Sequence, residues 1–302
     1  MKTLRLFIAL FLFLTACAIP PMPEPTMTPD PSATASPSPT PAPRLGAGFR
    51  FSTYGPPRNP GPAYWASVGE QMAAKFPGAQ PEAIWIVGNF LGGGMTHLSF
   101  NAQNSGDPAI KSGAVDMNEA ALALFDQKGV KVWLQVEPAN AEMLTLIDLV
   151  MNQYKHHPCV IGFGVDVEWH KSDGSPEGTP VSDAEAEQWV KAIRAHGAQY
   201  RLFLKHWDPN WLPPTYREGL VFVNDSQQFE SFDQLVADFS AWGQHFSPAP
   251  VAFQYGYPDD RKWWGNLADP PGEIGKAILA NVPNTSALFW VDFTVFEVFP
   301  PQ

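Results

Sequence analysis

Short apolar segments alternate with amphipathic ones along most of this chain, and this alternation constrains the fold more than any other feature. The apolar runs have the length and composition of β-strands, and several are separated by stretches with helical spacing. Strands are expected at residues 48–54, 83–90, 130–137, 160–169, 200–206, 220–224, 251–257 and 287–294. Helices are expected at residues 118–128, 140–154, 182–196 and 231–246. The pattern predicts an α/β fold, a (β/α)8 TIM barrel over residues 46–302, with a doubly wound open sheet as the alternative.

Signals at the ends of these segments support the barrel. Ser182 and Glu185 have the spacing of a capping box, in which side chains satisfy the free amide groups at a helix start. No Gly-x-Gly-x-x-Gly turn follows the first strand, which disfavours the open sheet. Residues 90–116 are rich in Gly and Asn, so an elaborated loop is expected there. Its triple glycine is not followed by the Lys-Ser or Lys-Thr of a phosphate-binding loop, and no cofactor is predicted.

Residues 1–17 have the pattern of a bacterial export signal. Two basic residues precede an apolar run at residues 6–14, which is too short to cross a membrane as a mature helix. The run ends in Leu-Thr-Ala-Cys, which resembles the lipobox in which a cysteine thiol takes a lipid. We therefore predict a lipoprotein signal peptide, lipidation of Cys17 and an extracytoplasmic protein anchored to a bacterial membrane. An ordinary signal peptide with a chance cysteine is the alternative.

Residues 18–45 consist mainly of Pro, Thr and Ser. Such a segment cannot bury enough apolar surface to offset the entropy lost on ordering, and its prolines favour extended polyproline II. We predict a disordered tether that holds the folded domain away from the membrane.

The charge of the chain bears on its partners. The formal net charge is −11, and Lys and Arg do not cluster along the sequence. This composition argues against nucleic acid and acidic lipid headgroups, so membrane contact is expected only through the N-terminal lipid, and a monomer is expected. If Cys17 is lipidated, Cys159 has no disulfide partner, and its place before an apolar run predicts a small core residue.

The expected fourth strand carries the most informative pattern. Because side chains alternate along a strand, Gly162, Gly164, Asp166 and Glu168 are expected to share one face. The bulky residues between them, and Trp169 after them, are expected to pack against the helices. The first face would look into the barrel, with both carboxyl groups at the C-terminal end of the strand, where barrel enzymes place their active sites.

Two neighbouring carboxyl groups suit acid catalysis. Asp166 and Glu168 would lie roughly 6–7 Å apart at Cα, and repulsion in a partly dry site raises the pKa of one of them. An acid that keeps its proton near neutral pH is what cleavage of a glycosidic bond requires. A sugar-binding cleft without turnover and a structural carboxyl pair neutralised by Lys or Arg are the alternatives.

The segment Gly-Phe-Gly-Val-Asp-Val-Glu at residues 162–168 resembles the Asp-Gly-x-Asp-x-Asp-x-Glu motif of glycoside hydrolase family 18. That family contains chitinases and endo-β-N-acetylglucosaminidases on a (β/α)8 barrel. The resemblance implies that Glu168 is the proton donor and that Asp166 orients the substrate N-acetyl group, whose carbonyl oxygen is the nucleophile. Ile161 and Gly164 stand where the motif has its first two acids. The implied function is a cell-surface hydrolase of poly- or oligosaccharides that contain N-acetylhexosamine.

Further residues are candidates for substrate contact. Trp290 lies on the expected eighth strand, where family 18 has a Trp below the bound sugar. Tyr255 and Tyr257 would supply the hydroxyl that the family uses near the acetamido group, although they fall on the seventh strand instead of the sixth. Polar residues at other strand ends would converge on the same site: Gln135, Glu137, Lys205, His206, Asp225 and Asp292.

Two other classes remain open. Family 25 lysozymes are a second resemblance, because they also carry Asp-x-Glu at a strand end, and a muramidase would follow from it. Arg50 and Ser52 occupy the region where those enzymes have an Asp on the first strand. A non-catalytic carbohydrate-binding lipoprotein would use the same cleft, and the missing acids at Ile161 and Gly164 favour it.

Metal chemistry is weakly indicated. His156 and His157 are adjacent at the end of an expected helix and are not expected to face one site. The sequence contains neither His-x-His nor His-Glu-x-x-His, so no metal centre is predicted. The absence of a Gly-x-Ser-x-Gly motif disfavours a serine hydrolase of the α/β type.

Overall fold

The computed structural model describes residues 44–102, 105–174 and 178–301. The predicted signal peptide, the lipidation of Cys17 and nearly all of the tether fall outside these residues and stay predictions. Within the described residues, no helix is both long enough and apolar enough to cross a membrane.

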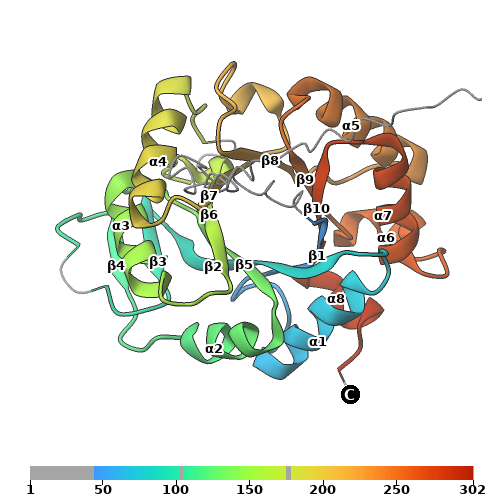
Figure 1. Ribbon diagram of the computed structural model, residues 1–302, viewed down its shortest axis with the longest axis horizontal. Coiled ribbons are helices and arrows are strands. Elements are labelled where there is room, and N and C mark those ends of the chain that lie inside the picture. Colours follow the sequence, from blue (N-terminus) through green and yellow to red (C-terminus); the bar gives the residue numbers. More distant parts are fainter. Residues whose placement is uncertain (1–43, 103–104, 175–177, 302) are drawn as a thin grey trace, which may run out of the picture. The chain divides into compact units, whose positions relative to one another are not determined.

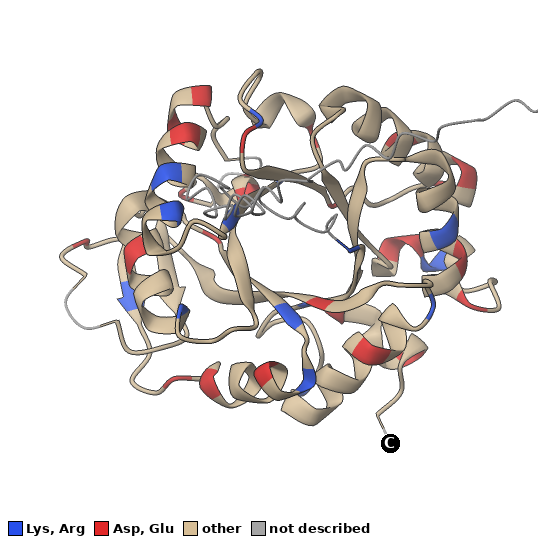
Figure 2. Ribbon diagram, viewed as in Figure 1, with Lys and Arg blue, Asp and Glu red and all other residues tan. Residues whose placement is uncertain are grey.

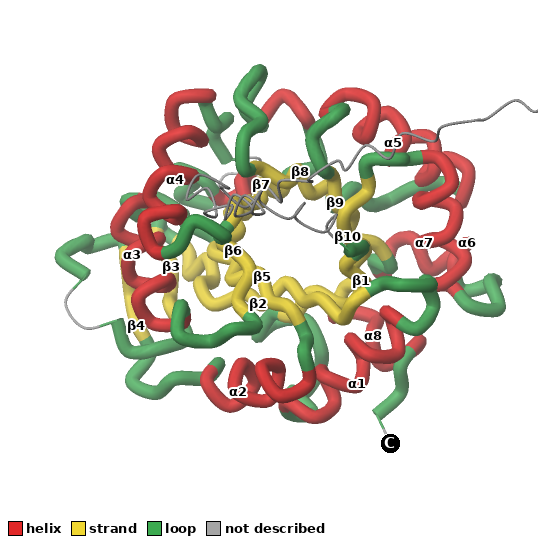
Figure 3. The backbone as a smooth tube through the Cα atoms, viewed as in Figure 1, coloured by secondary structure: helices red, strands yellow, loops and turns green. Residues whose placement is uncertain are grey.

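A closed ring of parallel strands forms the centre of the domain (Figures 1 and 3). Its members, in order around the ring, are β1 (Gly46–Phe51), β2 (Gln80–Gly92), β5 (Lys131–Val136), β6 (Val160–Asp166), β7 (Arg201–Lys205), β8 (Leu220–Asn224), β9 (Val251–Tyr255) and β10 (Thr285–Val291). β1 pairs in parallel with both β2 and β10, and this closes the ring. The (β/α)8 barrel is therefore confirmed, and the doubly wound open sheet is excluded.

Helices surround the ring (Figure 3). They are α1 (Pro62–Ala73), α2 (Glu119–Lys128), α3 (Met143–Tyr154), α4 (Asp183–His196), α5 (Phe232–Phe246), α6 (Arg261–Trp264), α7 (Pro270–Asn281) and α8 (Val295–Val298). Short 3-10 turns follow four strands: η1 (Val167–Trp169), η2 (Pro209–Trp211), η3 (Pro258–Asp260) and η4 (Asp292–Thr294). The predicted capping box at the start of α4 is confirmed, because Ser182 and Glu185 each accept a hydrogen bond from the other's backbone N–H.

The segment after β2 is more ordered than the sequence predicted. β3 (Met95–Leu98) pairs antiparallel with β2, and β4 (Ile110–Ser112) pairs in parallel with β3. Both strands lie outside the ring (Figure 3). The three glycines at residues 92–94 all have positive φ and form the turn between β2 and β3. The prediction of an elaborated loop was wrong for this part, because the glycines mark a hairpin turn.

The inside of the barrel is filled by side chains of alternate strand positions. A small apolar cluster there includes Trp133 and Phe203. A Cβ atom on Gly162 would lie 2.4 Å from the Trp133 ring, and one on Gly164 would lie 2.1 Å from the Phe203 ring. The two glycines of β6 therefore make room for these aromatic rings. The bulky residues that alternate with them belong to the larger core outside the ring, which confirms the predicted faces of this strand.

Acidic and basic residues are both spread over the ring of helices (Figure 2). The expectations that nucleic acid and acidic lipids are not partners, and that the chain is a monomer, stay predictions. Cys159 is buried in the outer core, as its position in the sequence predicted.

Candidate active site

A cavity of about 370 Å³ lies at the C-terminal ends of the barrel strands. Its volume falls within the range of about 300–1,000 Å³ that is usual for ligand pockets. Its wall contains four acids, two cations, one amide and five aromatic residues: Glu137, Asp166, Glu168, Asp225, Arg50, Lys205, Gln227, Tyr54, Phe90, Trp169, Tyr257 and Phe293. Several of the predicted site residues are thus brought together by the fold.

Asp166 is the last residue of β6 and is almost fully buried. Its Oδ2 lies 2.8 Å from Lys205 Nζ and accepts a 3.4 Å hydrogen bond from Gln135 Nε2. Its Oδ1 is buried without a hydrogen-bond partner in the described part of the chain. The pKa of Asp166 is held well above its usual value, because burial raises it more than the Lys205 ammonium lowers it, and the nearby Glu168 raises it further.

Lys205 links three strands. It is the last residue of β7, and its buried ammonium pairs with Asp166 on β6 and with Asp225 directly after β8. Burial lowers the pKa of Lys205, but the two carboxylates outweigh it and hold the pKa well above its usual value. Lys205 therefore stays charged, and Asp166 and Asp225 are its counter-ions.

Glu168 differs from the other acids of the wall. It lies in the η1 turn, is partly exposed, and forms no hydrogen bond or ion pair with any residue that the structure describes. Burial raises the pKa of Glu168, Lys205 lowers it, and Asp225 and Glu137 raise it. The pKa of Glu168 is therefore raised overall, as is that of Asp166, but Glu168 is the one of the two that does not contact the Lys205 ammonium.

A second network fixes the other side of the cavity. Arg50, on β1, pairs with Asp292 and donates a 2.7 Å hydrogen bond to the Tyr54 hydroxyl. Tyr54 donates in turn to Glu137, whose second oxygen accepts the backbone N–H of Phe90 at 2.7 Å. Glu137 therefore lines the cavity with both oxygens already hydrogen-bonded. Its carboxylate is held in place by β2 and by the loop after β1.

Asp292 was predicted to face the site and lies behind it. It is fully buried, pairs with Arg50, and accepts hydrogen bonds from the backbone N–H and the hydroxyl of Ser52. It is not part of the cavity wall. The prediction of a substrate contact was wrong for this residue, because its oxygens serve Arg50 and the β1 backbone. Its role is to hold the guanidinium of Arg50.

An aromatic pair forms one wall of the cavity. The rings of Phe90 and Trp169 are stacked, with centroids 4.3 Å apart. Trp169 was expected to pack under the helices. That expectation was wrong, because β6 ends at Asp166 and the η1 turn breaks the alternation of the strand.

Of the two tyrosines predicted to contact substrate, only Tyr257 lines the cavity, and its hydroxyl donates a 3.3 Å hydrogen bond to Gln254. Tyr255 lies outside the ring, where its hydroxyl donates to the Pro271 carbonyl of α7 at 2.9 Å. Trp290 is fully buried beside Tyr255, with ring centroids 5.5 Å apart. The predictions for Tyr255 and Trp290 were wrong because their strand positions face the helices.

The remaining candidates support the site from outside the wall. His206 is fully buried and stacks on Trp211, with centroids 5.3 Å apart, and its Nδ1 accepts a hydrogen bond from the Asp208 backbone. It does not line the cavity, so its prediction as a substrate contact was also wrong. Gln135 likewise lies outside the wall, but its amide contacts Asp166.

Several residues of the wall were not predicted from the sequence. Arg50 could have been found, because it alternates with Gly48 and Ser52 and so lies on the inward face of β1. Tyr54, Gln227 and Phe293 lie beyond strand ends, where no regular spacing indicates the direction of a side chain, and Phe90 lies in the last part of β2, which pairs with β3.

Comparison with known proteins identifies a fold and no family. No family model matches the chain, and no curated protein is similar to it. A candidate alpha-L-fucosidase from Bacteroides thetaiotaomicron matches with a TM-score of 0.52 and 11% identity, over 88% of this chain and 91% of that one. An endoglucanase from Pseudomonas stutzeri (14% identity, 82% and 85% covered) and an endo-1,4-beta-mannanase from Eisenia fetida (11%, 82% and 84%) reach TM-scores of 0.47. The first likeness shows a shared barrel fold, and the other two are too weak to bear on it.

Proposed function

We propose that this chain is a glycoside hydrolase whose general acid is Glu168. The observation that carries the proposal is the state of this carboxyl group. It lines the cavity, it has a raised pKa, and no described residue holds it by a hydrogen bond or ion pair. A proton donor must reach its substrate and keep its proton until the bond breaks, and Glu168 meets both conditions.

The substrate class that fits the site best is a glycan with N-acetylhexosamine. Asp166 Oδ2 is held by Lys205, whereas Oδ1 is buried without a partner among the described residues. An acetamido N–H of a bound sugar would satisfy this oxygen, and buried acceptors are normally satisfied. This function for Asp166 is the one that the resemblance to family 18 implies.

The reaction then follows from the two carboxyl groups. Glu168 gives its proton to the glycosidic oxygen as the bond to the anomeric carbon breaks. The acetamido carbonyl oxygen, oriented through Asp166, bonds to that carbon and forms an oxazolinium ion. Glu168, now a carboxylate, takes a proton from water as the water attacks the anomeric carbon and opens the ring. The Lys205 ammonium, 2.8 Å from Asp166, favours the anionic form of Asp166 beside the developing positive charge.

The aromatic wall supports a sugar substrate. The stacked pair of Phe90 and Trp169 presents apolar surface next to Glu168, and aromatic faces bind the C–H faces of sugar rings well. The candidate fucosidase that shares the fold is in keeping with chemistry on sugars.

A non-catalytic sugar receptor is the second candidate, and a specific observation favours it. Asp166 is fixed by the ion pair to Lys205, and the acids that would support it in family 18 are replaced by Ile161 and Gly164. A receptor would bind glycan in the same cavity without turnover.

The deciding experiment measures release of fluorophore from a panel of fluorogenic glycosides, including those of N-acetylglucosamine and chito-oligosaccharides. The full chain is compared with Glu168→Gln, and Glu230→Gln serves as the control, because Glu230 is exposed, lies outside the cavity wall and forms an ion pair with Lys262. Turnover by the wild type and the control that is lost in Glu168→Gln would establish the hydrolase.

The same experiment separates the two candidates. If no glycoside is turned over while the wild type binds chito-oligosaccharides in calorimetry, the receptor is correct and Glu168 is a sugar contact. If hydrolysis occurs only with sugars that lack an acetamido group, the proposed function of Asp166 is wrong, although the hydrolase stands.

A further inference from the structure

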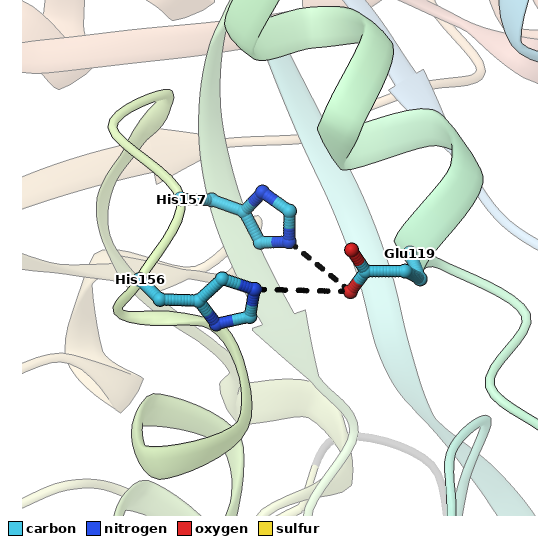
Figure 4. A group of neighbouring side chains, drawn as sticks. All are labelled: Glu119, His156 and His157. Carbon is cyan, nitrogen blue, oxygen red and sulfur yellow. Dashed lines mark hydrogen bonds and ion pairs between the residues drawn. The ribbon is translucent and has the colours of Figure 1, made fainter.

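A cluster of possible metal ligands lies away from the cavity, in the helical layer (Figure 4). His156 and His157 follow α3, and both imidazole rings point toward Glu119, the first residue of α2. Glu119 Oε2 lies 3.2 Å from His157 Nε2 and 3.9 Å from His156 Nε2. The expectation that these neighbouring histidines would not face one site was wrong, because they lie in the turn after α3 and not on the helix itself.

A second contact fixes the ring of His157. Its Nδ1 lies 2.6 Å from Asp126 Oδ2, on the same helix as Glu119. The other oxygen of Asp126 accepts the backbone N–H of Cys159 at 2.8 Å. In the tautomer with its proton on Nδ1, the ring donates that proton to Asp126, and Nε2 is left to bind an ion beside Glu119. Histidines that bind metals usually donate their other N–H to a carboxylate in this way.

We propose that Glu119, His156 and His157 bind a borderline divalent metal ion such as Zn²⁺, with Asp126 orienting His157. Zinc lies about 2.0–2.2 Å from nitrogen and carboxylate ligands in tetrahedral sites, which places two ligand atoms about 3.3–3.5 Å apart. The separations of 3.2 Å and 3.9 Å between Glu119 Oε2 and the two Nε2 atoms lie on either side of that spacing. Two imidazoles and one carboxylate suit Zn²⁺ or Cu²⁺ and do not suit Mg²⁺ or Ca²⁺, which prefer oxygen ligands.

The burial of the three side chains supports the same site. His157 is 4% exposed, whereas His156 and Glu119 are 59% and 51% exposed. One ligand is therefore held rigidly and two are reached from solvent, so an ion can enter and keep water in its fourth position. The ion would join α2 to the turn between α3 and β6.

Cys159 is close by but is not among the proposed ligands. Its thiol donates to the Leu122 carbonyl at 3.6 Å and is buried in the outer core. None of the proposed ligands belongs to the cavity wall at the mouth of the barrel. The metal site is therefore independent of the proposed hydrolase activity.

The test is calorimetric titration of the untagged full chain with Zn²⁺ after treatment with a chelator. We expect one ion per chain, and a melting temperature that rises with Zn²⁺. His156→Ala and Glu119→Gln should each weaken Zn²⁺ binding at least tenfold, and both positions are exposed enough for the fold to tolerate the change. Asp126→Asn should weaken binding by about 10–100-fold, since it only orients a ligand.

The matched control is His196→Ala. His196 Nε2 lies 2.8 Å from Asp148 Oδ1, so this is also a histidine paired with a carboxylate, but with a single imidazole. Its replacement should leave Zn²⁺ affinity unchanged. The proposal is overturned if the wild type takes up no stoichiometric zinc, because His157 then serves only to join Asp126 and Glu119 by hydrogen bonds. It is also overturned if His156→Ala and Glu119→Gln bind zinc as tightly as the wild type.

Discussion

The two ends of the barrel both bury charged side chains, and they differ in how those charges are paired. At the N-terminal ends of the strands, a cavity of about 700 Å³ contains Glu82, Trp133 and Arg201. Glu82 accepts a 2.7 Å hydrogen bond from Trp133 Nε1, and the Arg201 guanidinium lies 5.1 Å from the centroid of the Trp133 ring. At the C-terminal ends, a cavity of about 370 Å³ brings four carboxyl groups together with Lys205 and Arg50.

The difference supports the C-terminal end of the barrel as the proposed active site. At the N-terminal ends of the strands (the lower end), Glu82 has a hydrogen-bond donor in Trp133 and a nearby cation in Arg201. At the C-terminal ends (the upper end), acids outnumber cations, and buried oxygens of Asp166, Asp225 and Gln135 lack partners among the described residues. At the lower end, Asn284 Oδ1 is the buried oxygen of the described cavity wall that lacks one. Unsatisfied buried groups are costly and are expected where a ligand completes them. The larger cavity is therefore the less plausible active site, in keeping with the placement of barrel active sites at the C-terminal face.

The sharpest test of this comparison exchanges one acid at each end for its amide. Glu168→Gln should lower turnover by about 10²–10⁴-fold, because general acid catalysis contributes that much. Glu82→Gln should leave turnover unchanged, since Glu82 lies at the opposite end of the strands. Initial rates on the best fluorogenic substrate measure both. If a folded Glu82→Gln protein lost as much turnover as Glu168→Gln, the active site could not be assigned to the C-terminal end of the barrel.

The second test concerns the stability that Lys205 provides. Lys205→Met should lower the free energy of unfolding by about 3–5 kcal/mol, because it leaves two buried carboxylates without their cation. Lys262→Met is the control, since the exposed pair of Lys262 and Glu230 should contribute less than about 1 kcal/mol. Urea unfolding followed by circular dichroism gives both values. Equal free energies of unfolding for the two variants would show that Lys205 does not stabilise the fold through Asp166 and Asp225.

The parts of the fold that depend on local pattern could be predicted from the sequence, and the parts that depend on closure could not. All eight ring strands overlap predicted segments, and the inward face of β6 was correctly assigned, because alternation is a local property. The pair of Arg50 and Asp292 joins residues 242 positions apart and exists only because β1 pairs with β10. No pattern within either strand indicates it.

The errors at the site have one physical origin. Tyr255 and Trp290 were assigned to the cavity from strand order, but the register of β9 and β10 directs them toward the helices. Trp169 was assigned to the core by extending the alternation of β6 beyond the end of the strand. In both cases the direction of a side chain depends on where a strand begins and ends, and sequence determines this least well.

A third prediction concerns the lower end alone. Burial raises the pKa of Glu82, and its hydrogen bond from Trp133 and the charge of Arg201 lower it only in part. The folded state therefore binds this proton more tightly than the unfolded state. This stability is fully present below the unfolded pKa and is lost as pH rises through the folded pKa, at about 1.4 kcal/mol for each unit between the two.

Glu82→Gln should remove this dependence, so the variant should lose less stability than the wild type between acidic and neutral pH. Urea unfolding over a series of pH values provides the comparison. A variant whose stability falls with pH as steeply as that of the wild type would show that Glu82 is ionised throughout. The N-terminal end of the barrel would then hold an ionised buried carboxylate, as the C-terminal end does.

The smallest effect is expected from the aromatic wall, and it tests whether the upper cavity binds sugar. Trp169→Ala removes one member of the stacked pair beside Glu168, and such stacking contributes about 0.5–1.5 kcal/mol, or a rise in KM of about 2–12-fold. Because the ring contacts substrate before and during the reaction, kcat should change little. Trp207→Ala is the control, since Trp207 is 44% exposed and lies outside the wall. A fall in kcat with KM unchanged would instead mean that Trp169 positions the η1 turn, and with it the carboxyl group of Glu168.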